Sequence, residues 1–195
     1  MKIPEFLPGD LIFYHNNSFL GWLIRVVTRG KGEPATFSNH VAGFISNNDI
    51  VEALWTVKIS RFVINPEGKQ LKVYRRKGVS EDQRNKIAKN AIHYVGEWYG
   101  LTKLITHLGD ALLEKMFGGQ IFFFRKLNHS DKYPICSWVW AFSYKRALGY
   151  QFGIQPEGAD PDTIYDYVVK NNTWELIYYS DPEGVCSNDS LCWSY

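Results

Sequence analysis

A lone cysteine in the segment "KYPICSWVWAFSYKRAL", residues 132–148, has the chemistry of a nucleophile. Residues 138–142 are apolar on nearly every side of a helix, so we expect this helix to be central and buried. Cys136 lies in its first turn, where free N–H groups and the positive end of the helix dipole favour the reactive thiolate. The alternative is a small buried hydrophobic residue, which is the usual state of a free cysteine.

A cysteine nucleophile needs a base, and the chain has five histidines. His40 opens the predicted strand "HVAGFI" after a loop, so the sheet would hold its backbone while its side chain reaches a cleft. His15 follows a predicted strand and is a second candidate, although "HNNS" also reads as an ordinary turn. The other three histidines have no such position. His93 and His107 fall within predicted helices, and His129 lies in a polar loop.

The base in turn needs an orienting group, and Glu52 is an acid within the otherwise apolar strand "IVEALW". Burying that acid without a partner would be costly. A three-residue hairpin loop, 46–48, would pair Ile45 with Asp49 and place Glu52 diagonally across from His40, within reach. A two-residue loop would put the two side chains on opposite faces of the sheet. The sequence leaves both registers open.

The surrounding patterns predict a single α+β domain over residues 1–180, followed by a polar tail over 181–195. Ser80 and Gln83 form a capping-box pattern, and Asp160 with Pro161 has the pattern of a helix start. We expect helices at 19–30, 81–98, 101–117 and 161–170, and one within 132–148 that has Cys136 in its first turn. We expect a turn followed by a short apolar strand within 8–15, strands at 70–76 and 174–180, and a two-stranded hairpin over 40–59.

Composition excludes several classes of protein. The chain has 195 residues, of which 16% are aromatic, so a disordered chain is excluded. A formal net charge of +2 without a concentrated basic stripe argues against a nucleic-acid partner. No secretory signal and no apolar run of about 20 residues is visible, so we expect a cytoplasmic or particle-associated protein without a transmembrane segment.

Cysteine usage gives no support for a metal or a disulfide framework. The three cysteines are an odd number, and no C-x-x-C or H-x-x-x-H spacing occurs. Cys186 and Cys192 could pair only if the tail is exposed to oxidant, which would leave Cys136 free. We expect neither a metal nor another cofactor.

The order of segments resembles the circularly permuted branch of the NlpC-type papain-like hydrolases. That branch includes the YiiX/YaeF-like proteins, with lecithin:retinol acyltransferase as a more distant relative. The resemblance runs from Pro8 to about Val169 and rests on an ordered set: "PGDLIF", "SNHVAGFI", "IVEAL", "YVGEWYG", "YPICSWVWAFSYKRALG" and "GADPDTIYDYV". It implies a permuted papain-like fold, in which an antiparallel sheet or small barrel packs against the helix that carries the cysteine.

The resemblance also implies roles for three residues: Cys136 as nucleophile, His40 as base and Glu52 as the polar third residue. The activity expected from it is that of a cysteine peptidase or amidase acting on a small or cell-wall peptide. One alternative is a lipid or acyl-ester hydrolase or acyltransferase, in which 101–117 and Phe122–Phe124 would receive the acyl chain at a membrane surface. Another is a non-catalytic module, such as a component of a larger particle.

Overall fold

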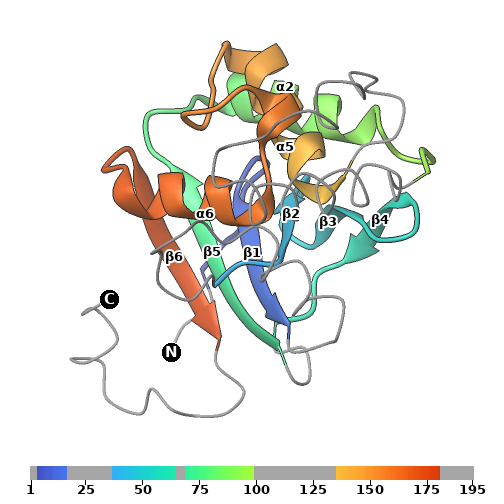
Figure 1. Cartoon of the computed structure of the whole chain (residues 1–195), viewed down its shortest axis with the longest axis horizontal. Helices are drawn as coiled ribbons and strands as arrows, with labels where there is room; N and C mark the ends of the chain where they lie inside the picture. The colour runs from blue at the N-terminus through green and yellow to red at the C-terminus, as the bar shows by residue number, and fades with distance from the viewer. Residues whose placement is uncertain (1–3, 17–36, 65–68, 99–134, 181–195) are drawn as a thin grey trace, which may run out of the picture.

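One antiparallel sheet forms the body of the molecule in the computed structural model, which describes residues 4–16, 37–64, 69–98 and 135–180. Its strand order is β4-β3-β2-β1-β5-β6, which runs from right to left across Figure 1. The strands are β1 (Leu11–Asn16), β2 (His40–Phe44), β3 (Asp49–Ala53), β4 (Val57–Arg61), β5 (Lys69–Arg76) and β6 (Trp174–Ser180). Every neighbouring pair of strands is antiparallel. The sheet and the helices together confirm the predicted mixed α and β class.

Helices cover one face of this sheet. They are α2 (Glu81–Ile92), α5 (Cys136–Leu148) and α6 (Pro161–Lys170), together with the short 3-10 helix η1 (Pro156–Gly158). In Figure 1, α5 lies beside β2 and β3, and α6 lies beside β6 and also contacts β5 through the Lys72–Tyr165 hydrogen bond. Among the described residues, no helix is both long enough and apolar enough to cross a membrane.

Helix α5 packs so closely on the sheet that one strand position requires glycine. Gly43 of β2 faces Trp140 of α5, and a Cβ atom at Gly43 would lie 2.6 Å from the indole ring. The indole Nε1 of Trp140 donates to the carbonyl of Val51 at 3.3 Å. Because Trp140 is fully buried, this contact fixes the distance between α5 and the strands β2 and β3.

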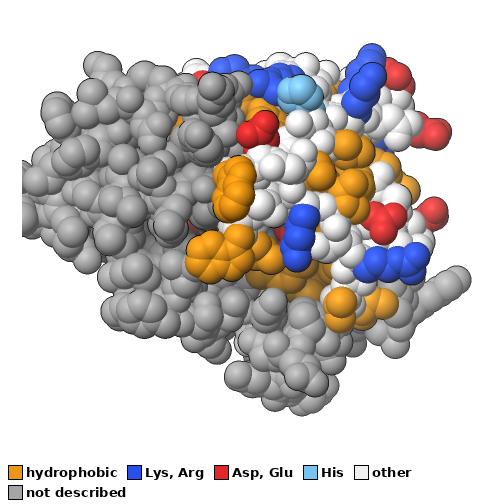
Figure 2. Space-filling model, turned by 90° about the vertical axis from the view of Figure 1, so that its right-hand side faces the viewer, with side chains coloured by type: hydrophobic (Ala, Val, Ile, Leu, Met, Phe, Trp, Pro, Cys, Tyr) orange, Lys and Arg blue, Asp and Glu red, His pale blue; other side chains and the backbone are white. Residues whose placement is uncertain are grey.

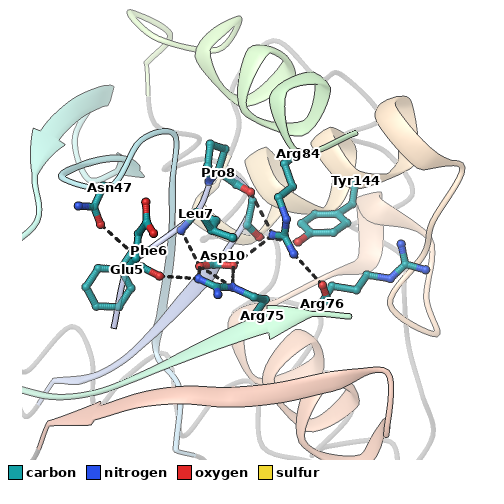
Figure 3. Close-up of polar contacts among 11 residues, drawn as sticks. Glu5, Phe6, Leu7, Pro8, Asp10, Asn47, Arg75, Arg76, Arg84 and Tyr144 are labelled. Carbon is teal, nitrogen blue, oxygen red and sulfur yellow. Dashed lines mark hydrogen bonds and ion pairs between the residues drawn. The ribbon is translucent and has the colours of Figure 1, made fainter. Parts of the chain in front are cut away.

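A buried carboxylate ties the start of β1 to β5 and α2 (Figure 3). Asp10 has no exposed surface, and its carboxylate accepts hydrogen bonds from Arg75 at 2.6 Å and from Arg84 at 3.3 Å. The backbone N–H of Leu7 donates to the same carboxylate at 2.8 Å. Tyr144 of α5 donates to the carbonyl of Gly9, one residue before Asp10. This cluster therefore fixes α5, as well as α2, against the strand next to β2.

Most predicted elements agree with the structure. The capping box is present, with Ser80 accepting from the N–H of Gln83 and Gln83 accepting from the N–H of Ser80. Asp160 caps α6, which starts at Pro161. The Cys136 helix, the strand at 70–76 and the closing strand at 174–180 agree with α5, β5 and β6.

Two predicted elements were wrong in extent. The helix expected to reach Trp98 ends at Ile92, because Gly96 takes a φ of 94° and its N–H donates to the carbonyl of Val57. Residues after the helix thus pair with β4 rather than continuing the helix. The second strand of the expected hairpin is two strands, β3 and β4, because the chain turns at residues 54–56.

Several predictions fall outside the described residues. These are the helix at 19–30, the helix at 101–117, the run Phe122–Phe124, the histidines His107 and His129, and the tail 181–195 with Cys186 and Cys192.

Candidate active site

Cys136 is the first residue of α5, and its side chain is 3% exposed. Ile135 is the N-cap residue and makes no side-chain capping hydrogen bond, so the first turn keeps N–H groups for other acceptors. The backbone N–H groups of Val41 and Ser137 lie beside the sulfur of Cys136 and act to lower the pKa of its thiol. Ser137 is fixed in turn, since its hydroxyl donates to the carbonyl of Ala159 at 2.8 Å.

His40 is the first residue of β2, and its side chain is 18% exposed. Backbone pairing holds it, because Tyr14 of β1 lies directly opposite and the N–H of Asn39 donates to the carbonyl of Tyr14 at 3.1 Å. Ser38 donates to the carbonyl of His40 at 3.2 Å. These contacts therefore hold the backbone of His40 at the strand end.

The sequence is compatible with a two-residue or a three-residue loop between β2 and β3, and the structure has the three-residue loop. Ala42 pairs with Glu52, and Phe44 pairs with Ile50, so the loop consists of residues 46–48. Ser46 fixes this loop, because its hydroxyl accepts from the N–H of Asp49 at 3.0 Å and donates to the Asp49 carboxylate at 2.9 Å. The register therefore places His40 and Glu52 on the same face.

Glu52 faces His40 and Lys58 from the middle of β3. Its Oε2 lies 3.8 Å from Nε2 of His40, and its Oε1 lies 3.8 Å from Nζ of Lys58, so both contacts are ion pairs longer than a hydrogen bond. Burial raises the pKa of Glu52, but the interactions with His40, Ser60 and Lys58 outweigh burial and lower this pKa to about 2. Glu52 is therefore ionised at neutral pH.

Cys136 and His40 interact directly, and their pKa values move in opposite directions. Burial lowers the pKa of His40. The charge of Cys136 and its interaction with the ring, together with the carboxylate of Glu52, outweigh burial and raise this pKa to about 9. Burial raises the pKa of the Cys136 thiol, but the charge of His40 and the hydrogen bonds from His40, Val41 and Ser137 lower it below its ordinary value. At neutral pH these shifts favour a thiolate–imidazolium ion pair.

Tyr14 is part of this site and was not predicted from the sequence. Its ring centroid lies 5.7 Å from that of His40. Burial, and then the charge of Glu52, raise the pKa of Tyr14, so it stays neutral. The only sequence signal is that Tyr14 lies in a predicted strand. Its place beside His40 depends on the pairing of β1 with β2, which is a non-local contact.

The other described histidines lie elsewhere. Nδ1 of His15 is 2.7 Å from the carbonyl oxygen of Phe37. His93 is the C-cap residue of α2. The structure thus brings His40, rather than either of these, to Cys136.

Comparison with known proteins supports the fold rather than the chemistry. No protein-family model matches the chain, and no curated protein matches it by sequence. A solved structure does match: the metalloprotein yiiX from Escherichia coli O157:H7, described as DUF1105. The alignment covers 92% of this chain and 100% of that one, with a TM-score of 0.62 and 18% sequence identity. The chain has a YiiX-like fold. At this identity the YiiX likeness concerns the fold alone.

The yiiX protein is described as a metalloprotein. In the ranges that the structure describes, no three His, Cys, Asp or Glu side chains are grouped so that they could hold a metal ion. Cys136, His40 and Glu52 have suitable donor types, but their arrangement is that of an ion-paired row with His40 in the middle. These residues do not fit a metal site.

Proposed function

We propose that this protein is a cysteine hydrolase that cleaves an amide bond of a small peptide through a thioester on Cys136. The observation that carries the proposal is the placement of His40 between Cys136, the first residue of α5, and Glu52 at 3.8 Å, and the opposite directions of the Cys136 and His40 pKa shifts agree with it. A thiolate is the nucleophilic form of cysteine, and a neighbouring imidazolium both stabilises it and can donate a proton.

The proposed reaction has two halves. The Cys136 thiolate attacks the amide carbonyl, an S–C bond forms, and His40 gives its proton to the leaving nitrogen as the C–N bond breaks. Water then attacks the thioester while His40 accepts a proton from that water. The S–C bond breaks, the acid product leaves, and the thiolate–imidazolium pair is restored.

Glu52 and the start of α5 support these steps. Glu52 stabilises the imidazolium through the 3.8 Å ion pair and favours one orientation of the ring. The backbone N–H of Cys136 is a first-turn donor without an intrahelical carbonyl partner, so it is suited to stabilise the oxyanion that forms on the attacked carbonyl. The order of this arrangement, with the His strand before the Cys helix, is the basis for proposing a permuted papain-like enzyme of the NlpC type.

An acyl-ester substrate is the second candidate, supported by exposed apolar side chains. Trp55 and Trp98 are 77% and 69% exposed, and Trp98 bridges to Thr56, next to Trp55. Figure 2 shows hydrophobic side chains gathered on the face seen from the β4 side. Exposed indoles of this kind are suited to an acyl chain or a lipid surface.

Acyl-enzyme trapping tests the proposal. The protein is mixed with a p-nitrophenyl ester or an N-acyl peptide p-nitroanilide, and the intact mass is measured after acid quenching. We expect an acyl adduct on Cys136 and its loss in Cys136→Ala, with unchanged circular dichroism. Turnover by folded Cys136→Ala equal to that of the wild type would refute the proposal.

A further inference from the structure

A half-buried lysine lies among aromatic rings on the face of the sheet that carries Cys136. Nζ of Lys72 lies 4.3 Å from the ring centroid of Phe37, 5.5 Å from that of Tyr165 and 5.6 Å from that of Tyr179. It also donates a hydrogen bond to the Tyr165 hydroxyl at 2.9 Å. The rings therefore hold the ammonium group in a defined place.

This ammonium group has no counter-charge in the part of the chain that the structure describes. Lys72 makes no ion pair there, and burial alone lowers its pKa, with no carboxylate acting to raise it. A lysine has three N–H donors, and Tyr165 takes one of them. Among the described residues, the other two donors and the positive charge have no partner, which suits them to an external anion.

Strand register places Lys72 in the same row as the backbone that holds the thiolate. Lys72 is directly opposite Phe13, and Phe13 is directly opposite Val41, whose backbone lies beside the sulfur of Cys136. Residues in one row across a sheet point to the same face, and two strand spacings are about 10 Å. A substrate chain of about three extended residues spans that distance.

We propose that Lys72 binds a carboxylate of the substrate on which Cys136 acts, so that the preferred substrate is an acidic peptide. This inference rests on the proposed function. One ammonium group with two spare donors matches a singly charged carboxylate, whereas a phosphate dianion commonly needs several cations or a cradle of backbone N–H groups. The aromatic rings provide an apolar wall for the chain between the carboxylate and the attacked carbonyl.

Alkylation of Cys136 by reagents of matched length tests this site without a known substrate. The acidic reagent is N-iodoacetyl-6-aminohexanoic acid, whose carboxylate lies about 10 Å from the reactive carbon when extended, about the length of three extended residues. N-hexyl iodoacetamide is its neutral match, and iodoacetamide reports the thiolate alone. Rates are measured by mass spectrometry of the Cys136 peptide in wild type, Lys72→Met, Lys72→Arg and, as a charge control, Lys77→Met.

We expect Lys72→Met to lower the ratio of the acidic to the neutral rate by about tenfold, the effect of losing one hydrogen bond to a charged group. The iodoacetamide rate should change little, Lys72→Arg should keep most of the ratio, and Lys77→Met should keep all of it. An unchanged ratio in Lys72→Met, or an equal fall with iodoacetamide, would overturn the Lys72 site and leave the proposed function intact. Slow iodoacetamide labelling in wild type, with the pH profile of an ordinary thiol, would overturn the proposed function and this inference with it.

Discussion

Glu52 and His40 lie diagonally across the β2–β3 strand pair, with Oε2 3.8 Å from Nε2. Their side chains are only 15% and 18% exposed, so solvent and salt screen this charge pair much less than a surface pair. Glu52 therefore adds to the effect of Cys136 in raising the pKa of His40 to about 9. The activation of the thiol and the register of one hairpin are thus directly connected.

The first prediction concerns the pH dependence of Cys136 reactivity. The His40 cation lowers the pKa of the thiol, so iodoacetamide should label wild-type Cys136 rapidly well below pH 8. In His40→Ala the cation is absent and burial remains, so fast labelling should require a pH above the ordinary thiol pKa of about 8.5. The measurement is the labelling rate of the Cys136 peptide from pH 5 to 10, with glutathione as the reference thiol. Identical profiles for the two proteins would contradict the ion pair.

The second prediction concerns Glu52→Gln and the alkaline limit of turnover. The proposed mechanism needs the imidazolium, so kcat/KM should fall as pH rises through the His40 pKa of about 9. Removing the Glu52 charge lowers the folded-state pKa of His40, so the alkaline limb should move down by about one pH unit. Some activity should remain, with kcat/KM lower by roughly 10- to 100-fold, because only part of the acid–base contribution is lost.

Lys58→Met is the matched control for Glu52→Gln. It removes the other charge beside Glu52, at 3.8 Å, while leaving the carboxylate in place. Because Lys58 is half exposed, its ion pair contributes little, and the alkaline limb should stay near pH 9. If the alkaline limb of kcat/KM stays near pH 9 in Glu52→Gln too, Glu52 does not act on His40.

The sequence predicted the elements of the site better than their relation to each other. Cys136 at a helix start and His40 at a strand start follow from local patterns. The face of Glu52 does not, because side chains alternate with a period of two and one residue of loop length reverses the face. The side-chain hydrogen bonds of Ser46 within the loop choose the register, and the segment "SNND" is compatible with either loop.

Non-local pairing explains the other differences between prediction and structure. Tyr14 joins the site because β1 pairs with β2, which no local pattern in its own strand specifies. The helical pattern of residues 81–98 continues past Ile92, but Gly96 turns the chain and its N–H donates to Val57. In both cases the local structure of a segment is determined by a partner that is distant in sequence.

The third prediction concerns Gly43→Ala, which adds a methyl group 2.6 Å from the Trp140 ring. Relief of this overlap requires α5 to move, so the free energy of unfolding should fall by about 1–3 kcal/mol in urea denaturation. Because α5 carries Cys136, the iodoacetamide rate at pH 6 should fall as well. Trp140→Phe provides space at the same contact, so the double variant should be less destabilised than the sum of the two single variants. Strict additivity would mean that Gly43 and Trp140 do not limit the approach of α5.

The fourth prediction concerns Asp10, which fixes the strand beside β2. Asp10→Asn removes a fully buried charge that faces Arg75 and Arg84, and it leaves both guanidinium groups without their carboxylate. Breaking a buried pair from one side commonly costs about 3–5 kcal/mol. The partial exposure of Arg75, and the carbonyls of Pro8 and Arg76 that still accept from Arg84, argue for the lower figure. We therefore expect a loss of about 3 kcal/mol in the free energy of unfolding.

Asp82→Asn is the matched control for Asp10→Asn, since Asp82 pairs with Lys86 at 2.7 Å on an exposed surface of α2. That variant should change stability by less than about 1 kcal/mol, as exposed ion pairs do. Equal effects of the two substitutions would show that Asp10 is no more than a surface charge. If Asp10→Asn is destabilised as expected, Cys136 alkylation below pH 8 should still be fast in the folded fraction, because Asp10 stabilises the scaffold and has no contact with the thiol.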